Sequence, residues 1–283
     1  MQQNHFGPCK RAVVYRAAMA LLLLGAMLGG CQAPQLVLQE LATEHSRQVE
    51  TLASQPFPLV FSPLAIKPAT SRIRVYLEGD GHAWATRSQP SLDPSPRHLL
   101  VAQLAFADPE SSIYLARPCQ FLKPTGCTNA LWTNRRFAPE VVDSLDNALS
   151  LIKSRYGNDQ FELIGYSGGA ALALLLAVRR DDIAQVQTLA GNLSPQQWAQ
   201  LQKLSPLTGS MEPLDQRRYL AEVPQRHLAG ADDDIVPYEV LRYYIKKLGP
   251  TTCLEMAVIA NVSHAEGWQS AWLDWRERAL NCK

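Results

Sequence analysis

The sequence predicts an α/β fold: a doubly wound, mainly parallel sheet with helices on both faces. Short apolar runs typical of strands alternate with helical runs from residue 72 to residue 282. One helical run, 168–180, is almost wholly apolar, as expected of a helix packed into the core of such a fold. No internal repeat or low-complexity segment interrupts the alternation. These observations together predict one domain.

The individual elements follow from the same patterns. Strands are expected at residues 72–79, 111–117, 161–167, 183–191, 225–232 and 253–263. Helices are expected at residues 98–108, 137–157, 168–180, 238–249 and 269–282. The helix at 137–157 is predicted by apolar residues spaced three to four positions apart, at Val141, Leu145, Leu149 and Ile152. Residues 192–216 are neither clear strand nor core helix, and we expect them to form a small cap across the rim of the sheet.

The composition is that of a globular protein with enough apolar material for one large core. Of the 283 residues, 47% are hydrophobic and 19% are charged. Lysine and arginine total 27 against 26 acidic residues, so no strong field favours nucleic acid as a partner. We therefore expect no nucleic-acid partner, while composition says little about the ligand and does not indicate an oligomeric state.

The first thirty residues have the pattern of an export signal. Lys10, Arg11 and Arg16 precede an apolar run that ends at Cys31, and the run is shorter than the roughly 20 residues that span a bilayer. The segment Leu28-Gly29-Gly30-Cys31 resembles a bacterial lipobox, which implies that Cys31 becomes the lipid-modified first residue of the mature protein. An ordinary signal peptide with an incidental cysteine is the alternative.

The predicted signal has consequences for location and domain organisation. Gln32, rather than an aspartate, follows the cysteine, which resembles lipoproteins sorted to the outer membrane. We expect a lipid-anchored protein of the bacterial cell envelope that faces the periplasm. Residues 1–30 are then the signal peptide, residues 31–58 a tether or amphipathic lead-in, and residues 59–283 the folded domain.

Four cysteines remain after Cys9 in the leader and Cys31 are set aside, and the expected compartment permits disulfides. Cys119 and Cys127 flank a loop that contains proline and glycine, whereas Cys253 begins a predicted strand and Cys282 ends the last predicted helix. We predict the pairs Cys119–Cys127 and Cys253–Cys282, with buried free thiols as the alternative. No two cysteines have zinc-finger spacing, so no metal site is expected.

The pentapeptide Gly165-Tyr166-Ser167-Gly168-Gly169 lies between a predicted apolar strand and a predicted apolar helix. Here the sequence resembles the α/β-hydrolase superfamily, whose nucleophile elbow is a strand, the pattern G-x-S-x-G and a helix. The alternative is a turn of small residues that has this pattern by chance. The resemblance implies that Ser167 is the nucleophile. Gly165 and Gly169 lack the side chains that would collide in the tight turn.

The chain order of the superfamily, serine then acid then histidine, gives an independent test. Residues 227–237, HLAGADDDIVP, are similar to the family segment G-x-x-D-x-x-V-P, which places Asp233 in the acid position and leaves Asp234 as second choice. His264 is the one histidine beyond that acid, in the loop before the final helix. The resemblance, which covers about residues 60–281, implies a triad of Ser167, His264 and Asp233.

The resemblance also implies two backbone donors for an oxyanion. The N–H of Gly168 follows the serine at a helix N-terminus, and the loop YLEGDGHAW supplies the N–H of Asp80 as the second donor. Glu78 replaces the histidine usual in lipases, which leaves the substrate open. His82 is expected either to line the pocket or to be structural.

These residues predict a serine hydrolase, most simply one that cleaves a small-molecule ester or acyl substrate through an acyl-enzyme. A serine peptidase or amidase of the same fold is the first alternative, because the triad does not distinguish esters from amides. A catalytically inactive binding protein of the cell envelope is the second. No dinucleotide-binding pattern, P-loop or metal-ligand spacing is present, so no cofactor is expected.

Overall fold

An eight-stranded sheet forms the centre of the computed structural model, which describes residues 33–64, 71–280 and 282. The strand order is β1-β2-β4-β3-β5-β6-β7-β8. Strands β3 to β8 pair in parallel, whereas β1 with β2 and β2 with β4 are antiparallel. The predicted mainly parallel sheet is therefore confirmed, with an antiparallel edge that the sequence patterns did not indicate.

The elements follow one another in the alternating order that the sequence predicts. The strands are β1 (Glu50–Leu52), β2 (Leu59–Ser62), β3 (Arg72–Leu77), β4 (Ser112–Leu115), β5 (Gln160–Tyr166), β6 (Ile183–Leu189), β7 (Gln225–Gly230) and β8 (Leu254–Ile259). The α-helices are α2 (Pro34–Glu44), α3 (Leu100–Phe106), α4 (Pro139–Tyr156), α5 (Gly168–Ala177), α6 (Pro195–Leu201), α7 (Arg217–Leu220), α8 (Tyr238–Leu248) and α9 (Trp268–Trp275). Short 3-10 helices are η1 (Asn129–Trp132) and η2 (Pro213–Gln216).

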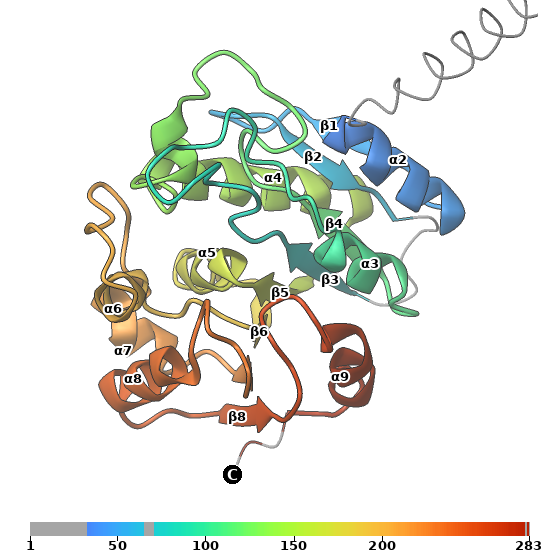
Figure 1. Ribbon diagram of the computed structural model, residues 1–283. Helices are drawn as coiled ribbons and strands as arrows, with labels where there is room; N and C mark the ends of the chain where they lie inside the picture. Colours follow the sequence, from blue (N-terminus) through green and yellow to red (C-terminus); the bar gives the residue numbers. More distant parts are fainter. Residues whose placement is uncertain (1–32, 65–70, 281, 283) are drawn as a thin grey trace, which may run out of the picture. The chain divides into compact units, whose positions relative to one another are not determined.

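Helices cover both faces of the sheet, as Figure 1 shows. One apolar cluster joins α4, α5 and α8 to the sheet, and a second joins α2, α3 and α9 to the opposite side. All ten residues of α5 are buried, which explains why its sequence is almost wholly apolar. Since α5 begins directly after Ser167, this buried helix fixes the position of the serine.

The segment before residue 59 contributes to the folded unit. Helix α2 buries Leu38 and Ala42 completely or nearly so, and β1 extends the sheet by pairing with β2. The described part of residues 31–58 is thus packed against the domain. Cys31 and the predicted signal peptide lie outside the described residues. Among the described residues, no helix has the length and apolar character needed to cross a bilayer.

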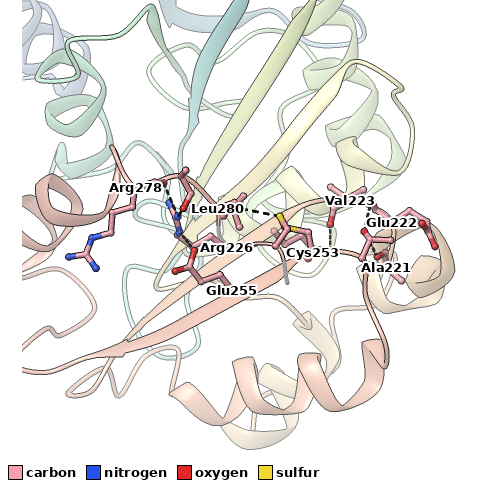
Figure 2. The surroundings of a disulfide bond; sticks show 12 residues. Ala221, Glu222, Val223, Arg226, Cys253, Glu255, Arg278 and Leu280 are labelled. Atoms are coloured by element: carbon pink, nitrogen blue, oxygen red, sulfur yellow. Dashed lines mark hydrogen bonds and ion pairs between the residues drawn. A yellow bond between two sulfur atoms is a disulfide. The ribbon is translucent and has the colours of Figure 1, made fainter.

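The chain after α9 differs from the sequence prediction. The helix ends at Trp275 rather than near Cys282, because the following residues run across the sheet and use their carbonyl groups as acceptors. The fully buried guanidinium of Arg226 on β7 donates to the carbonyl oxygens of Arg278 and Ala279 at 2.8 and 3.0 Å, and to the Glu255 carboxylate at 2.8 Å (Figure 2). This arrangement holds the tail against β7 and β8.

Two disulfides are present, Cys119–Cys127 and Cys253–Cys282. They are the pairs that the sequence analysis proposed. The second joins the start of β8 to the C-terminal tail close to Arg226 (Figure 2). The first closes the loop after β4, and Gln120 inside that loop donates from its amide to the carbonyl oxygen of Gly79 at 3.0 Å. That loop therefore supports the segment after β3.

Candidate active site

The turn from β5 into α5 holds Ser167 in a conformation that is strained for any residue but glycine. Its φ and ψ are 51° and −122°. A Cβ atom on Gly165 would lie 2.6 Å from the carbonyl oxygen of Gly169, and one on Gly169 would lie 2.7 Å from that of Glu78. The steric need for these two glycines therefore agrees with the sequence prediction. The turn presents Ser167 at the carboxyl end of a central parallel strand, where ligand sites of such sheets form.

Ser167 belongs to a hydrogen-bonded chain with His264 and Asp233. The Ser167 Oγ lies 3.0 Å from Nε2 of His264, and Nδ1 of His264 lies 2.9 Å from Oδ2 of Asp233. The other carboxylate oxygen of Asp233 accepts hydrogen bonds from the backbone N–H groups of Ile235 and Val236 at 3.0 and 2.8 Å. The structure thus brings together the three residues that the sequence placed in a triad.

Burial separates Asp233 from its neighbours. The Asp233 side chain has no exposed surface, whereas Asp232 and Asp234 are exposed. The backbone carbonyl oxygen of Asp234 accepts from the Gln202 amide at 2.7 Å, and its side chain has no hydrogen bond to His264. Asp233, the first choice for the acid, is therefore the residue that contacts His264, whereas Asp234, the second choice, does not.

Tyr166 positions the loop that carries His264. Its hydroxyl donates to the carbonyl oxygen of His264 at 2.7 Å, and the two rings lie 5.3 Å apart. Burial, with smaller effects of the Glu78 and Asp233 charges, raises the pKa of Tyr166, so the hydroxyl remains a donor at neutral pH. The indole Nε1 of Trp268 donates to the same carbonyl at 3.1 Å. The residue before the serine and the first residue of α9 together orient the histidine.

Two buried arginines hold Asp80 beside the serine. Arg117 Nη1 pairs with one carboxylate oxygen of Asp80, and Arg136 Nη1 lies 2.5 Å from the other. Burial raises the pKa of Asp80, but the charges of Arg136 and Arg117 outweigh this effect and hold its pKa below the usual value. The carboxylate is close enough to Gly168 that a Cβ atom there would lie 2.7 Å from Asp80 Cγ. Asp80 is therefore ionised and fixed next to the start of α5.

The backbone N–H groups of Asp80 and Gly168 donate to no acceptor in the described part of the chain. Unpaired N–H groups at the N-terminus of a helix and on a nearby loop suit the binding of a negatively charged oxygen. Gly168 and Asp80 are the two residues that the sequence analysis named for this purpose. The structure places them side by side, and their function remains a prediction.

Glu78 is buried directly before this loop. Its carboxylate accepts from the backbone N–H of Gly79 and from the Tyr114 hydroxyl, each at 2.9 Å. Burial raises the pKa of Glu78 to about 7, although these hydrogen bonds and the charge of Arg117 partly oppose the shift. At the position where lipases commonly have histidine, this chain therefore has a carboxyl group that is partly protonated at neutral pH.

A cavity of about 410 Å³ lies against Ser167 and His264. Its lining includes Arg136, Asn192 and Trp198, and His82 also contributes to it. Trp198 packs against Val236 and Val240 as well, and its Nε1 donates to the carbonyl oxygen of Ile235 at 2.7 Å. Residues 192–216 thus border the cavity through α6. A larger hollow of about 580 Å³ beside α2 has no serine, threonine or cysteine in its lining.

The sequence analysis missed the two arginines and Asn192. Arg117 follows β4 by two positions and Asn192 follows β6 by three, so both come after the carboxyl ends of strands. That position was a usable signal. Nothing in the local sequence distinguishes Arg136 from its exposed neighbour Arg135, which pairs with Glu140.

Comparisons with known proteins agree with this architecture. An esterase of Pyrococcus furiosus superposes with a TM-score of 0.60 at 12% identity, over 83% of this chain and 91% of that one. The fold is that of the α/β hydrolases. A serine hydrolase without a lid from Xanthomonas campestris gives a TM-score of 0.51 at 12% identity, over 82% of this chain and 96% of that one.

An acylaminoacyl peptidase of Pyrococcus horikoshii gives a TM-score of 0.55 at 11% identity, over 80% of this chain and 38% of that longer one. The similar structures thus include both an esterase and a peptidase. No protein-family model matches the sequence, and no curated protein matches it. At these identities the likeness concerns the fold, and the residues of the site have to support any function.

Proposed function

We propose that this protein is a serine hydrolase that cleaves carboxylic esters through an acyl-enzyme intermediate. The observation that carries the proposal is the continuous hydrogen-bonded chain from Ser167 through His264 to Asp233, at 3.0 and 2.9 Å. It lies beside a cavity and next to two unpaired backbone N–H groups. A nucleophile, a base, a buried acid and an anion site are the parts that acyl transfer requires.

In the proposed mechanism, Nε2 of His264 accepts the proton of the Ser167 hydroxyl while Oγ bonds to the ester carbonyl carbon. The carbonyl oxygen takes up negative charge and accepts hydrogen bonds from the N–H groups of Gly168 and Asp80. The imidazolium then gives its proton to the leaving alcohol, and the acyl-enzyme forms. Water, deprotonated by His264, attacks the acyl carbon and releases the acid and the free serine.

The decisive experiment combines turnover with active-site labelling. Wild-type protein beginning after Cys31 should hydrolyse p-nitrophenyl butyrate and react with a fluorophosphonate probe, whereas Ser167→Ala should do neither. Ser205→Ala is the matched control, because Ser205 is exposed in the segment 192–216 and should behave as wild type. Labelling that persists in the Ser167→Ala variant would contradict the assignment of the nucleophile.

Amide hydrolysis is the second candidate, and the structural likeness to an acylaminoacyl peptidase favours testing it. The same preparation should be offered ester, thioester and blocked peptide substrates with matched acyl groups. A higher kcat/KM for the peptide than for the ester would show that the protein is a peptidase and not an esterase. Folded protein that labels with no probe and turns over no substrate would instead support a binding protein.

We further propose that the protein is lipid-anchored at Cys31 and faces the periplasm, most simply from the outer membrane. The support is the basic and apolar pattern that ends at Cys31. Cells expressing the full chain should incorporate labelled fatty acid into it, and Cys31→Ala should abolish incorporation. Incorporation that survives this substitution would contradict the anchor.

A further inference from the structure

The cavity beside Ser167 has a cationic wall. The Arg136 side chain is 4% exposed, and its Nε donates to the carbonyl oxygen of Thr133 at 2.6 Å while Nη1 donates to Asp80 at 2.5 Å. Its Nη2 donates to no other described residue. Behind it, Arg117 directs one nitrogen to Asp80 and the other to the carbonyl oxygen of Arg136 at 2.5 Å. Two guanidinium groups therefore share one carboxylate, which leaves one positive charge in excess.

Other charged groups at the cavity do not cancel this excess. Asp233 is fully buried and paired with His264. Glu78 also lines the cavity, but burial raises its pKa to about 7, so the carboxyl carries no more than about half a negative charge at or below that pH and offsets only part of the excess. His82 and His98 add imidazole rings to the lining, and no further acidic residue contributes to it. An anion entering the cavity therefore meets a net attractive wall.

Asn192 provides a second and independent observation. It is 1% exposed, and its backbone N–H donates to the carbonyl oxygen of Ser167 at 3.0 Å, which fixes it beside the nucleophile. Its Oδ1 is buried without any hydrogen-bond partner, and its Nδ2 donates to no described residue. Because buried polar atoms are nearly always paired, an unpaired amide in the wall of a cavity indicates a group that a ligand supplies.

On the basis of the proposed esterase function, we propose that the preferred substrate is a polar ester with a carboxylate near the scissile carbonyl. Arg136 binds the carboxylate, and the Asn192 amide binds a hydrogen-bonding group of the same substrate. A purely structural role for Arg136, to hold the loop of Asp80, explains neither its free Nη2 nor the unpaired amide. A simple fatty-acid ester would leave both groups unsatisfied on binding.

The test uses two methyl esters that differ only at the far end of the acyl chain. Monomethyl glutarate carries a carboxylate where methyl pentanoate carries a methyl group. Wild-type protein should hydrolyse the anionic ester with a kcat/KM about tenfold higher, the size expected of one charge-assisted hydrogen bond. Arg136→Gln should bring this ratio to about one or below. A ratio of one or less in the wild type overturns the inference while ester turnover still supports the proposed function.

Arg135→Gln is the matched control, because Arg135 is adjacent in sequence, 45% exposed and paired with Glu140 at 2.6 Å. It should keep the wild-type ratio, and an equal fall of the ratio in both variants would overturn the inference. If Arg136→Gln does not fold, Asn192→Asp is the second variant. It places a negative charge in the same wall and should also lower the ratio, and an unchanged ratio would count against the inference.

Binding to the Ser167→Ala variant separates this inference from the proposed function. Calorimetry should give a Kd for monomethyl glutarate about tenfold lower than for methyl pentanoate, and Arg136→Gln in that background should remove the difference. This result in a protein whose wild type hydrolyses neither methyl ester nor p-nitrophenyl butyrate would refute the esterase and keep the carboxylate site at Arg136. Equal or undetectable binding of both esters would refute the anion site.

Discussion

Asp233→Asn is the substitution that most directly tests how the proposed base is held. In the structure, one carboxylate oxygen accepts from the N–H groups of Ile235 and Val236, and the other accepts from His264 Nδ1 at 2.9 Å. The two backbone donors need an acceptor, so the carbonyl oxygen of the new amide should stay with them. Its NH₂ group then faces Nδ1 of His264, which has to become an acceptor.

That change places the imidazole proton on Nε2, where it faces Ser167 and prevents His264 from accepting the serine proton. The same substitution in a serine protease triad lowers kcat about 10⁴-fold, and we expect a loss of about 10³ to 10⁴-fold here. In free energy this is about 4–5 kcal/mol of transition-state stabilisation. The free energy of unfolding should change by only about 1 kcal/mol, because the backbone hydrogen bonds remain.

The assay is kcat/KM for p-nitrophenyl butyrate together with urea unfolding of the same preparations. Asp232→Asn and Asp234→Asn are matched controls, since both residues are exposed neighbours, and both should keep wild-type activity. A loss below tenfold in folded Asp233→Asn protein would refute the proposed role of Asp233. If Asp234→Asn lost more activity than Asp233→Asn, the acid of the triad would be Asp234 instead of Asp233.

Three further predictions concern stability, each measured by urea unfolding. The pKa of Glu78 is raised to about 7 in the folded protein, so folding favours the protonated carboxyl. The stability that this carboxyl contributes to the folded state is complete below the unfolded pKa near 4.5 and is lost as the pH rises through 7. Glu78→Gln should therefore be more stable than wild type at pH 8 by about 3 kcal/mol, and equal stability would contradict the burial of an ionised carboxylate. Gly169→Ala forces a Cβ atom to 2.7 Å from the Glu78 carbonyl oxygen and should cost about 3 kcal/mol, whereas wild-type stability would contradict the tight turn. Arg226→Met leaves Glu255 and two tail carbonyls without their donor and should also cost about 3 kcal/mol, a value that a structureless tail would not produce.

The sequence predicted the parallel core because buried strands and helices have distinct periodicities. Helix α4 and the strand-turn-helix around Ser167 lie where the patterns placed them. The antiparallel edge was missed, since β1 has three residues and β2 has four, too few to establish a period. Helix α9 was predicted too long because no local pattern shows where it ends. Arg226, which is distant in sequence, donates to the carbonyl oxygens of Arg278 and Ala279 beyond its last residue.

The candidate site shows the same contrast between residues that local patterns specify and residues that depend on contacts across the chain. Ser167, Asp233 and His264 could be found because chain order and local motifs specify them. Arg136 could not, and for Arg117 only its place after the end of β4 was a signal, because the role of each depends on a contact with Asp80 across separations of 56 and 37 residues. Local sequence contains no record of such pairs. Asn192 escaped attention for another reason, since an asparagine after a strand usually caps a helix or forms a turn.

The two disulfides have a topological consequence for the proposed chemistry. The covalent loop from Cys253 to Cys282 contains β8, His264 and α9, so the base is carried on a closed ring of chain. The smaller ring from Cys119 to Cys127 contains Gln120, which supports the carbonyl group of Gly79 next to Asp80. A closed ring has fewer open conformations to visit than a linear segment, so local opening around either group is disfavoured. An oxidising environment would thus preserve the alignment of His264 and of the proposed oxyanion donor at Asp80, in addition to stabilising the fold as a whole.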